Sequence, residues 1–135
     1  MSIGAIALAK RRFPRLCPNG LHPYPGTSPR LIDPAQVEAA IAFLSMLTPT
    51  RTARIGSGIL KHDAERWAAR YGLGSYVSRG AILAAAVALG LTIRRRGASW
   101  AFNSAVAIGV SLKDLRRINC SMLQPQRTPD DRAAN

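Results

Sequence analysis

The feature that most restricts the fold of this chain is an apolar run near its middle, in which residues 82–89 are all alanine or aliphatic. Ser78 precedes the run as a good helix N-cap, and Gly90 follows it as a residue suited to a left-handed C-cap. A helix that is apolar on every side is a buried helix, and its alanines let other helices pack closely. The run therefore predicts a central helix around which the other elements pack.

Two amphipathic helices are expected before this central one. The first begins at Asp33 and Pro34, an N-cap followed by a favoured first helical residue, with Gln36 placed to close a capping box, and it ends at Pro49. The second begins near Ser57 and is stopped by glycines 72 and 74. Apolar residues recur at helical spacing in both. These stripes are Val37, Ala40, Ile41, Leu44 and Leu47 in the first helix, and Leu60, Ala64, Trp67, Ala68 and Tyr71 in the second.

A β-hairpin and one more helix are expected after the central helix. Residues 91–96 have the composition of a strand, Gly97 supplies a turn, and residues 99–103 can return as the partner strand. Residues 105–110 are apolar and fit either type of element. Ser111 and Asp114 then form a capping-box pattern, which predicts a last helix ending near Met122.

The two ends of the chain are expected to lie outside the packed domain. Five of the nine prolines fall within residues 1–32, which predicts a flexible, basic arm without a long regular element. The tail from residue 123 has few apolar residues and is expected to be disordered. The predicted fold is therefore mostly α with a small β-hairpin, an α+β fold whose single helical domain covers residues 33–122.

No pattern in the chain indicates a catalytic or metal centre. It has no glycine-rich phosphate loop, no nucleophile elbow and no metal-ligand spacing. His62 and Asp63 are neighbours on one helix and do not face each other, while Lys61 and Glu65 form an ordinary i,i+4 pair on a solvated helix face. We therefore expect no enzyme, no metal and no cofactor.

Cysteine usage and targeting signals point to the cytoplasm. The two cysteines, Cys17 and Cys120, are far apart in sequence, which favours free thiols in a reducing compartment over a disulfide framework. The apolar residues 3–9 come before a basic triplet, the reverse of the order in a secretory signal. The longest uncharged apolar stretch, residues 81–93, is shorter than the roughly 20 residues of a membrane-spanning helix.

The charge of the chain predicts an anionic partner. Sixteen of the nineteen basic residues are arginine, and the formal net charge is +12. Nucleic acid is the usual partner of such a protein. The predicted hairpin carries Arg94, Arg95 and Arg96, whose guanidinium groups can bind phosphates, and Trp100, whose ring can stack on an unpaired base. The alternative is that Trp100 is part of the core and that the arginines only protect an edge strand from pairing.

Further arginines at positions 51, 54 and 79 are expected to contribute phosphate contacts. A helix-turn-helix is also conceivable, since two helices flank a glycine turn. The helix after that turn offers only Ser78 and Arg79 as polar residues at its start, so it is a poor recognition helix.

Two segments resemble a known group of proteins. The segment 56–65 reads G-S-G-I-L-K-H-D-A-E, and the segment 76–86 reads Y-V-S-R-G-A-I-L-A-A-A. They are similar to S-Y-x-L-K-H-x-x-E and Y-V-S-N-G-A-x-I-A-A-A in an uncharacterised family of small proteobacterial accessory proteins encoded near plasmid, phage or integrative-element genes. Gly58 replaces the Tyr of that pattern, Arg79 replaces its Asn, and Asn103 matches a later Asn. The resemblance implies a mobile-element accessory protein and no catalytic residue.

Taken together, the sequence favours a non-enzymatic, cytoplasmic nucleic-acid-binding protein of low sequence specificity. The alternative is a protein-interaction module that inhibits or regulates a host or element protein. That module would use the apolar surface around Ile82 and Val87 or the face that carries His62. The sequence does not decide whether the protein forms a homo-oligomer through the alanine-rich helix. No membrane partner is expected.

Overall fold

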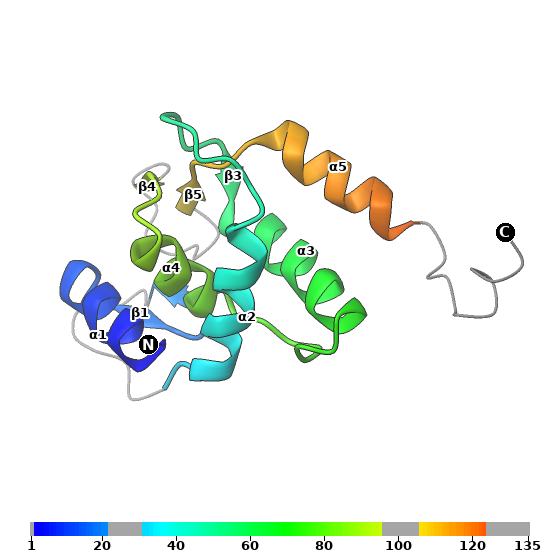
Figure 1. The fold of residues 1–135 in the computed structure, drawn as a ribbon. Helices are drawn as coiled ribbons and strands as arrows, with labels where there is room; N and C mark the ends of the chain where they lie inside the picture. The colour runs from blue at the N-terminus through cyan, green and yellow to red at the C-terminus, as the bar shows by residue number, and fades with distance from the viewer. Residues whose placement is uncertain (1, 22–30, 96–105, 124–135) are drawn as a thin grey trace, which may run out of the picture.

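A computed structural model describes residues 2–21, 31–95 and 106–123 of the chain (Figure 1). Within these ranges the chain is mostly helical with two small antiparallel sheets, which confirms the predicted fold class in its main terms. The helices are α1 (Ser2–Arg12), α2 (Pro34–Leu44), α3 (Ser57–Arg70), α4 (Arg79–Ala88) and α5 (Leu112–Met122). The strands are β1 (Leu16–Cys17), β2 (Gly20–Leu21), β3 (Ile55–Gly56), β4 (Ile93–Arg95) and β5 (Val106–Ile108).

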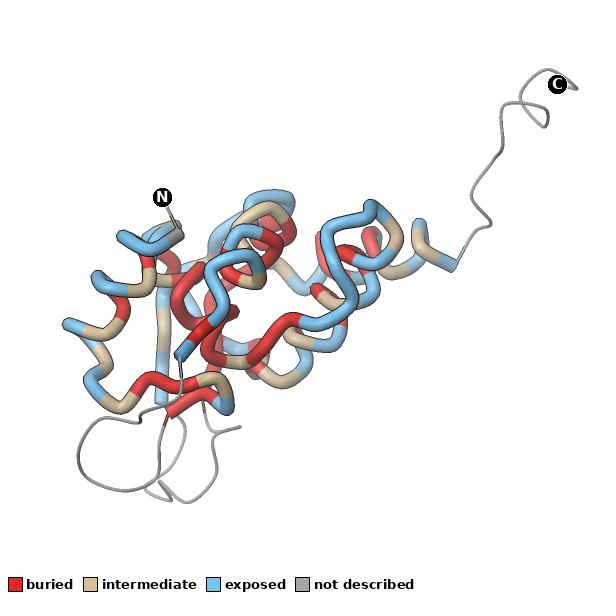
Figure 2. The backbone as a smooth tube through the Cα atoms, turned by 90° about the horizontal axis from the view of Figure 1, so that it is seen from below, coloured by how far each residue is buried: buried red, intermediate tan, exposed pale blue. Residues whose placement is uncertain are grey.

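The helix α4 is the centre of the fold, as its apolar sequence predicts. Its residues 80–86 are all buried, and α1, α2 and α3 pack on it. The Ser78 hydroxyl caps it by accepting a hydrogen bond from the Ala81 N–H at 3.1 Å. Gly90 follows with a φ of 69°, the left-handed conformation expected of a C-cap glycine. Figure 2 shows the buried segments gathered on the inner sides of the helices.

The prediction of a flexible arm over residues 1–32 is wrong for residues 2–21. These residues form α1 and the β1–β2 hairpin, and α1 packs against α4 and α2. The prolines that suggested an arm begin only at Pro14, after α1 has ended. Ala5 and Ala9 are buried, and small side chains such as these allow close helix packing. The remaining prolines of this segment, from residue 23, lie outside the described residues.

The hairpin is held by a close approach to the start of α4. Gly80 donates its N–H to the Pro18 carbonyl at 3.1 Å. A Cβ atom at Gly80 would lie 2.1 Å from the Cys17 carbonyl oxygen, so a larger residue does not fit there. Leu16 and Leu21 are buried and complete the contact. The packed domain therefore extends further toward the amino terminus than the sequence predicts.

The helix α2 begins as predicted and ends sooner. Asp33 is its N-cap and accepts a hydrogen bond from the Ala35 N–H at 2.9 Å. The helix stops at Leu44 instead of continuing to Pro49. Gln36 does not close a capping box, because its side-chain oxygen accepts a hydrogen bond from the Ser78 N–H at 2.9 Å. This bond fixes the start of α4 on α2.

The helix α3 matches its predicted bounds and most of its predicted apolar stripe. Trp67 is buried and packs against Phe43 of α2, with ring centroids 5.8 Å apart. Tyr71 departs from the prediction, since 55% of it is exposed. It follows the last residue of α3, and the chain then turns at Gly72, whose φ is 72°.

The first strand of the predicted β-hairpin is present over Ile93–Arg95, and it has a partner that the sequence left undecided. The strand β4 pairs with β5, so that Arg94 lies opposite Ala107 and Arg95 opposite Val106. The strand β5 also pairs with β3, and the sheet order is β3-β5-β4. All three residues of β5 are buried. The predicted return strand 99–103, together with Arg96, Trp100 and Asn103, lies outside the described residues.

The helix α5 follows the sheet and packs against α3. Its N-cap is Ser111, whose hydroxyl accepts a hydrogen bond from the Asp114 N–H at 3.1 Å, as predicted. The Asp114 carboxylate does not complete the box; it accepts a hydrogen bond from the Thr48 N–H at 2.7 Å. Hydrogen bonding from the side chain and backbone of Thr48 lowers the pKa of Asp114 below its ordinary value. Asp114 therefore connects α5 to the segment after α2.

Two further observations concern membranes and cysteines. No helix in the described part of the chain is both long and apolar enough to cross a membrane. Cys17 is buried in β1, Cys120 is exposed on α5, and both are free thiols.

Candidate nucleic-acid interface

The acidic side chains of the described residues are already engaged. Asp33 caps α2, and Asp63 pairs with Arg66 on α3. Asp114 lies 3.3 Å from Arg117, and Glu65 lies 2.5 Å from Lys61. The arginines of the described residues outnumber these carboxylates, so most of them cannot have one as a counter-charge. The surface charge of the domain is therefore strongly positive.

A groove lies between the segment before β3 and the start of α5; we call it the 50–55 groove. Arg51 and Arg54 are exposed on it, and its volume is about 440 Å³. Ile59 of α3 and Leu112 of α5 line it as exposed apolar side chains. The complete lining is Thr50, Arg51, Thr52, Arg54, Ile55, Ile59, Val110, Leu112 and Leu115. The groove therefore combines two cations with an apolar wall.

Backbone contacts between residues 48–50 and 109–111 hold the groove in place. The Thr50 N–H donates to the Gly109 carbonyl at 3.0 Å, and the Ser111 N–H donates to the Thr48 carbonyl at 2.8 Å. A Cβ atom at Gly109 would lie 2.5 Å from the Thr50 carbonyl oxygen, so this approach requires glycine. Two segments distant in sequence thus fix where Arg51 projects.

Arg94 and Arg95 belong to the same sheet as the groove. Both are exposed, and they lie on β4, at one edge of the β3-β5-β4 order. Neighbouring strands are about 4.8 Å apart, so β3 and β4 are roughly 10 Å apart across β5. Consecutive strand residues point to opposite faces, so Arg94 and Arg95 do not share one. The edge position also fits the alternative in which these arginines only protect the strand from pairing.

Arg79 does not line the groove. Its side chain is half-buried, and its guanidinium lies against Gly58 at the start of α3. The other predicted contact residues, Arg96 and Trp100, lie outside the described residues. Of the seven predicted positions, Arg51 and Arg54 thus line the groove, while Arg94 and Arg95 lie on the edge strand β4, on opposite faces of the sheet.

Basic residues on α5 extend the positive surface, and the sequence reasoning did not single them out. Lys113, Arg116 and Arg117 are exposed at the i, i+3, i+4 spacing that places residues on one helix face. Leu115 and Ile118 of the same helix are buried. The amphipathic pattern of α5 carried this signal, because the apolar residues alternate with the basic ones at helical period.

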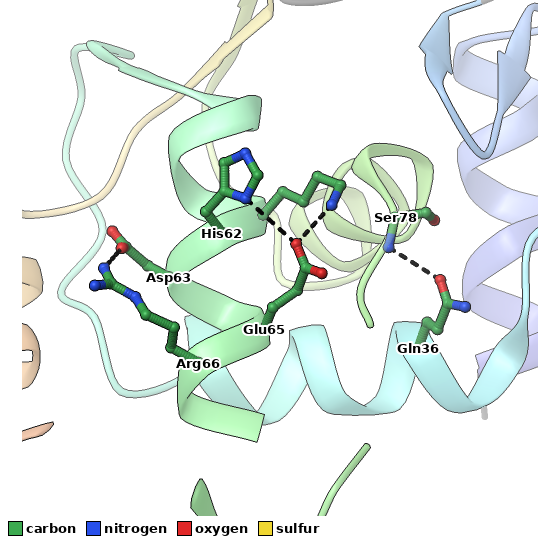
Figure 3. Close-up of polar contacts among 7 residues, drawn as sticks. Gln36, His62, Asp63, Glu65, Arg66 and Ser78 are labelled. Carbon is green, nitrogen blue, oxygen red and sulfur yellow. Dashed lines mark hydrogen bonds and ion pairs between the residues drawn. The ribbon is translucent and has the colours of Figure 1, made fainter. Parts of the chain in front are cut away.

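The polar residues of α3 form two separate groups (Figure 3). Glu65 lies 2.5 Å from the Lys61 ammonium and 3.5 Å from Nδ1 of His62, while Asp63 pairs with Arg66. His62 and Asp63 do not pair with each other, as predicted. The predicted solvated face is wrong for Asp63, which is buried, and for Lys61 and Glu65, whose side chains are mostly covered. Lys61 also lies over the Tyr76 ring, 4.5 Å from its centroid, and this contact accounts for part of the cover.

These ion pairs determine what the α3 cluster can do chemically. The Glu65 carboxylate already pairs with Lys61, and the Asp63 carboxylate with Arg66. No group of three or more His, Cys, Asp or Glu residues suited to a metal ion occurs within the described ranges. The cluster is best explained as part of the packing between α3 and the start of α4.

Comparisons of the chain with protein-family models, with curated proteins and with solved structures find no match. The arguments for function therefore rest on the charge, burial and contacts of the chain's own residues.

Proposed function

We propose that the protein binds nucleic acid without strong sequence preference, through arginines of the sheet and of the 50–55 groove. The observation that carries this proposal is the state of Arg51, Arg94 and Arg95. All three are exposed, and no ion pair joins any of them to a carboxylate within the described part of the chain. Guanidinium groups on the edge strand β4 and on the neighbouring groove are suited to phosphate oxygens, which they bind in a bidentate manner.

The apolar wall of the groove adds to this proposal. Ile59 and Leu112 are exposed next to Arg51, so a strand whose phosphates pair with arginine can place its bases or sugars against them. The exposed basic face of α5 begins at the same wall with Lys113. A nucleic-acid strand that follows the groove toward α5 would therefore keep its phosphates next to basic side chains.

The test is binding of labelled single-stranded and duplex DNA by fluorescence anisotropy. Wild-type protein is expected to bind both at about 50 mM salt and to lose roughly 10³-fold or more in affinity by about 200 mM if six or more phosphates are contacted. Changing Arg51, Arg94 and Arg95 to Ala should weaken binding to every sequence alike and lower the duplex salt slope by about 0.9 for each lost contact.

A matched control has the same loss of charge in another place. Lys10, Arg11 and Arg12 end α1, which packs on α4 and α2 (Figure 1). Changing these three to Ala removes three positive charges and leaves the sheet intact. If both triple variants lose affinity equally, net charge explains the binding and the proposed interface is wrong. If wild-type protein shows no binding at about 50 mM salt, nucleic-acid binding itself is wrong.

On the basis of the sequence resemblance, we further propose that the protein is an accessory protein of a plasmid, phage or integrative element. Low-specificity binding suits an accessory protein that handles nucleic acid of many sequences. Co-purification of nucleic acid with the protein from its host, with and without nuclease, tests this setting.

A protein-interaction module is the second candidate, and one observation favours it. Tyr71, Leu73 and Tyr76 are all exposed in the turn between α3 and α4, where they form an apolar patch. The surface first expected around Ile82 is not available, because Ile82 is fully buried. Ala81, Ala84, Ala85 and Ala86 of α4 are buried within the chain and only Ala88 of that helix's alanines is exposed, so α4 offers no alanine face for a homo-oligomer. A partner that survives both nuclease and high salt, and that is lost on Leu73→Asp, would favour this candidate.

A further inference from the structure

Two positive groups face each other where α3 begins beside α4. Arg79 is the first residue of α4, and its guanidinium lies over Gly58, the second residue of α3. A Cβ atom on Gly58 would lie 3.3 Å from Nη2 of Arg79 and 3.4 Å from Nε. The amino terminus of a helix carries partial positive charge, which favours a nearby anion and disfavours a nearby cation.

No negative group of the described residues compensates this arrangement. The N-cap of α3 is Gly56, which provides no side-chain hydrogen bond, and the first turn of α3 contains no acid. Arg79 forms no ion pair and no hydrogen bond within the described ranges. The first N–H groups of α3 therefore lack a side-chain acceptor, and the guanidinium lacks a counter-ion.

Two buried polar atoms at the same place are also without partners. Ser57, the first residue of α3, is 0% exposed, and its hydroxyl has no hydrogen-bond partner. Nε of Arg79 is buried and likewise unpartnered. Buried polar atoms are nearly always hydrogen-bonded, and a buried cation without a partner is costly. Both atoms are thus in a state that a bound anion would correct.

We propose that Ser57, Arg79 and the amino end of α3 bind a phosphate group. The guanidinium supplies a planar fork of donors, the Ser57 hydroxyl supplies one donor, and the free N–H groups of α3 supply more. Gly56, Gly58 and Arg79 are each half-buried, so this site is partly exposed to solvent, while the Ser57 hydroxyl and Nε of Arg79 lie at its buried end. The phosphate can be a free ion or the terminal phosphate of a nucleic acid. The site uses none of the exposed arginines of the sheet and goes beyond the proposed function.

Isothermal titration of the full chain with sodium phosphate, at an ionic strength held constant with sodium chloride, tests the pocket. We expect saturable binding of one phosphate per chain. Arg79→Gln should weaken it by at least about tenfold, since hydrogen bonds to charged groups are the stronger ones. Arg11→Gln is the matched control, with the same change at an exposed arginine in the last turn of α1, and should leave phosphate affinity unchanged. Absence of saturable binding, or equal binding by Arg79→Gln, overturns the proposal.

Thermal melting distinguishes a ligand-binding role from a purely structural one. Without phosphate, Arg79→Gln should melt at or above the wild-type temperature, because the change removes an unpaired cation from a helix amino terminus. With phosphate, only the wild type should gain stability. Gly58→Ala keeps the charge and displaces the guanidinium, so it should also weaken binding and gives a result even if Arg79→Gln does not fold. An unchanged phosphate affinity in Gly58→Ala would count against the pocket.

To identify the source of the phosphate, the affinities of two oligonucleotides of the same sequence are compared, one with a 5′-phosphate and one without. Tighter binding of the phosphorylated strand, lost in Arg79→Gln and competed by inorganic phosphate, supports the pocket and assigns it to a nucleic-acid terminus. Equal binding of the two strands, together with saturable binding of inorganic phosphate, supports the pocket and assigns it to the free ion. DNA binding that persists while the phosphate titration fails would remove the pocket and leave the sheet arginines as the interface.

Discussion

Gly80→Ala tests the part of the fold that the sequence did not predict, the seating of the β1–β2 hairpin on α4. The change adds one methyl group at the closest approach between the two elements. The new Cβ would lie 2.1 Å from the carbonyl oxygen of Cys17 and 2.8 Å from its carbonyl carbon. These are backbone atoms, so they cannot rotate away as the end of a flexible side chain can. The hairpin must move outward by about 1 Å to restore ordinary contact.

The expected cost follows from three contributions. Forcing an extra methyl group into a packed contact costs about 1–3 kcal/mol. Moving the hairpin weakens the bond from Gly80 N–H to the Pro18 carbonyl, worth about 0.5–1.5 kcal/mol. Alanine is about 1 kcal/mol better than glycine inside a helix, which offsets part of this cost. We therefore expect a net loss of about 0.5–3.5 kcal/mol of unfolding free energy.

Chemical denaturation followed by circular dichroism measures this loss, and Gly4→Ala is the matched control. Gly4 lies in α1 with nothing within 4 Å of its added Cβ, so only the helix-propensity gain of up to about 1 kcal/mol should appear. The two changes are chemically identical and should have opposite signs. If Gly80→Ala is as stable as wild type, the hairpin is not seated on α4. If Gly4→Ala gives no gain, α1 is not part of the cooperative unit.

Three other changes test single contacts of the fold. Trp67→Ala should lower the unfolding free energy by about 3–5 kcal/mol, because the ring is buried between α2 and α3. An unfolding free energy within about 1 kcal/mol of wild type would place Trp67 on the surface. The lowered pKa of Asp114 means that the folded state binds its proton less readily than the unfolded state, so its contribution to stability is present at neutral pH and is lost as pH falls from the ordinary value of 3.8 through the folded-state pKa. The melting temperature should therefore fall less between pH 7 and about pH 2 for Asp114→Asn than for wild type. An equal fall in the two proteins would contradict the hydrogen bond from Thr48 to Asp114. Gln36→Ala leaves the Ser78 N–H without an acceptor and should cost about 1–3 kcal/mol, while Gln36→Glu keeps an acceptor and should recover most of it in the same assay.

Helix starts were predictable because their signals are local. The hydroxyls of Ser78 and Ser111 and the carboxylate of Asp33 each accept a backbone N–H two or three residues further on, so a short stretch of sequence contains the whole interaction. The positive φ of Gly72 and Gly90 likewise follows from residue type at the end of a helical run. Interactions of this range do not depend on the rest of the fold.

The errors occurred where the decisive contact is distant in sequence. The prolines predict an arm over residues 1–32, whereas α1 packs on α4, which is distant in sequence, and Ala5 and Ala9 are buried. The sequence of β5 fits either type of element because all of its residues are buried, and a strand covered on both faces has no alternating pattern. Local spacing predicts that Gln36 and Asp114 cap their own helices, but each accepts a hydrogen bond from a distant backbone N–H. Composition alone does not show which partner such a side chain will find.

The same reasoning applies to the site residues. Charge alone predicts all five arginines as phosphate contacts. The structure places Arg51 and Arg54 on the groove beside β3, Arg94 and Arg95 on β4 across β5, and Arg79 on α4 against Gly58. Charge predicts the sign of the partner, whereas the pairing of strands decides which arginines can meet it.

Gly58 and Arg79 show how a contact between two helices makes one residue depend on another. The structure places the Arg79 guanidinium against the bare Cα of Gly58, in the space that a side chain at position 58 would need. The first turn of α3 contains no acid, and its N-cap is a glycine. The guanidinium therefore adds a positive charge at the amino end of α3, where an anion would balance it.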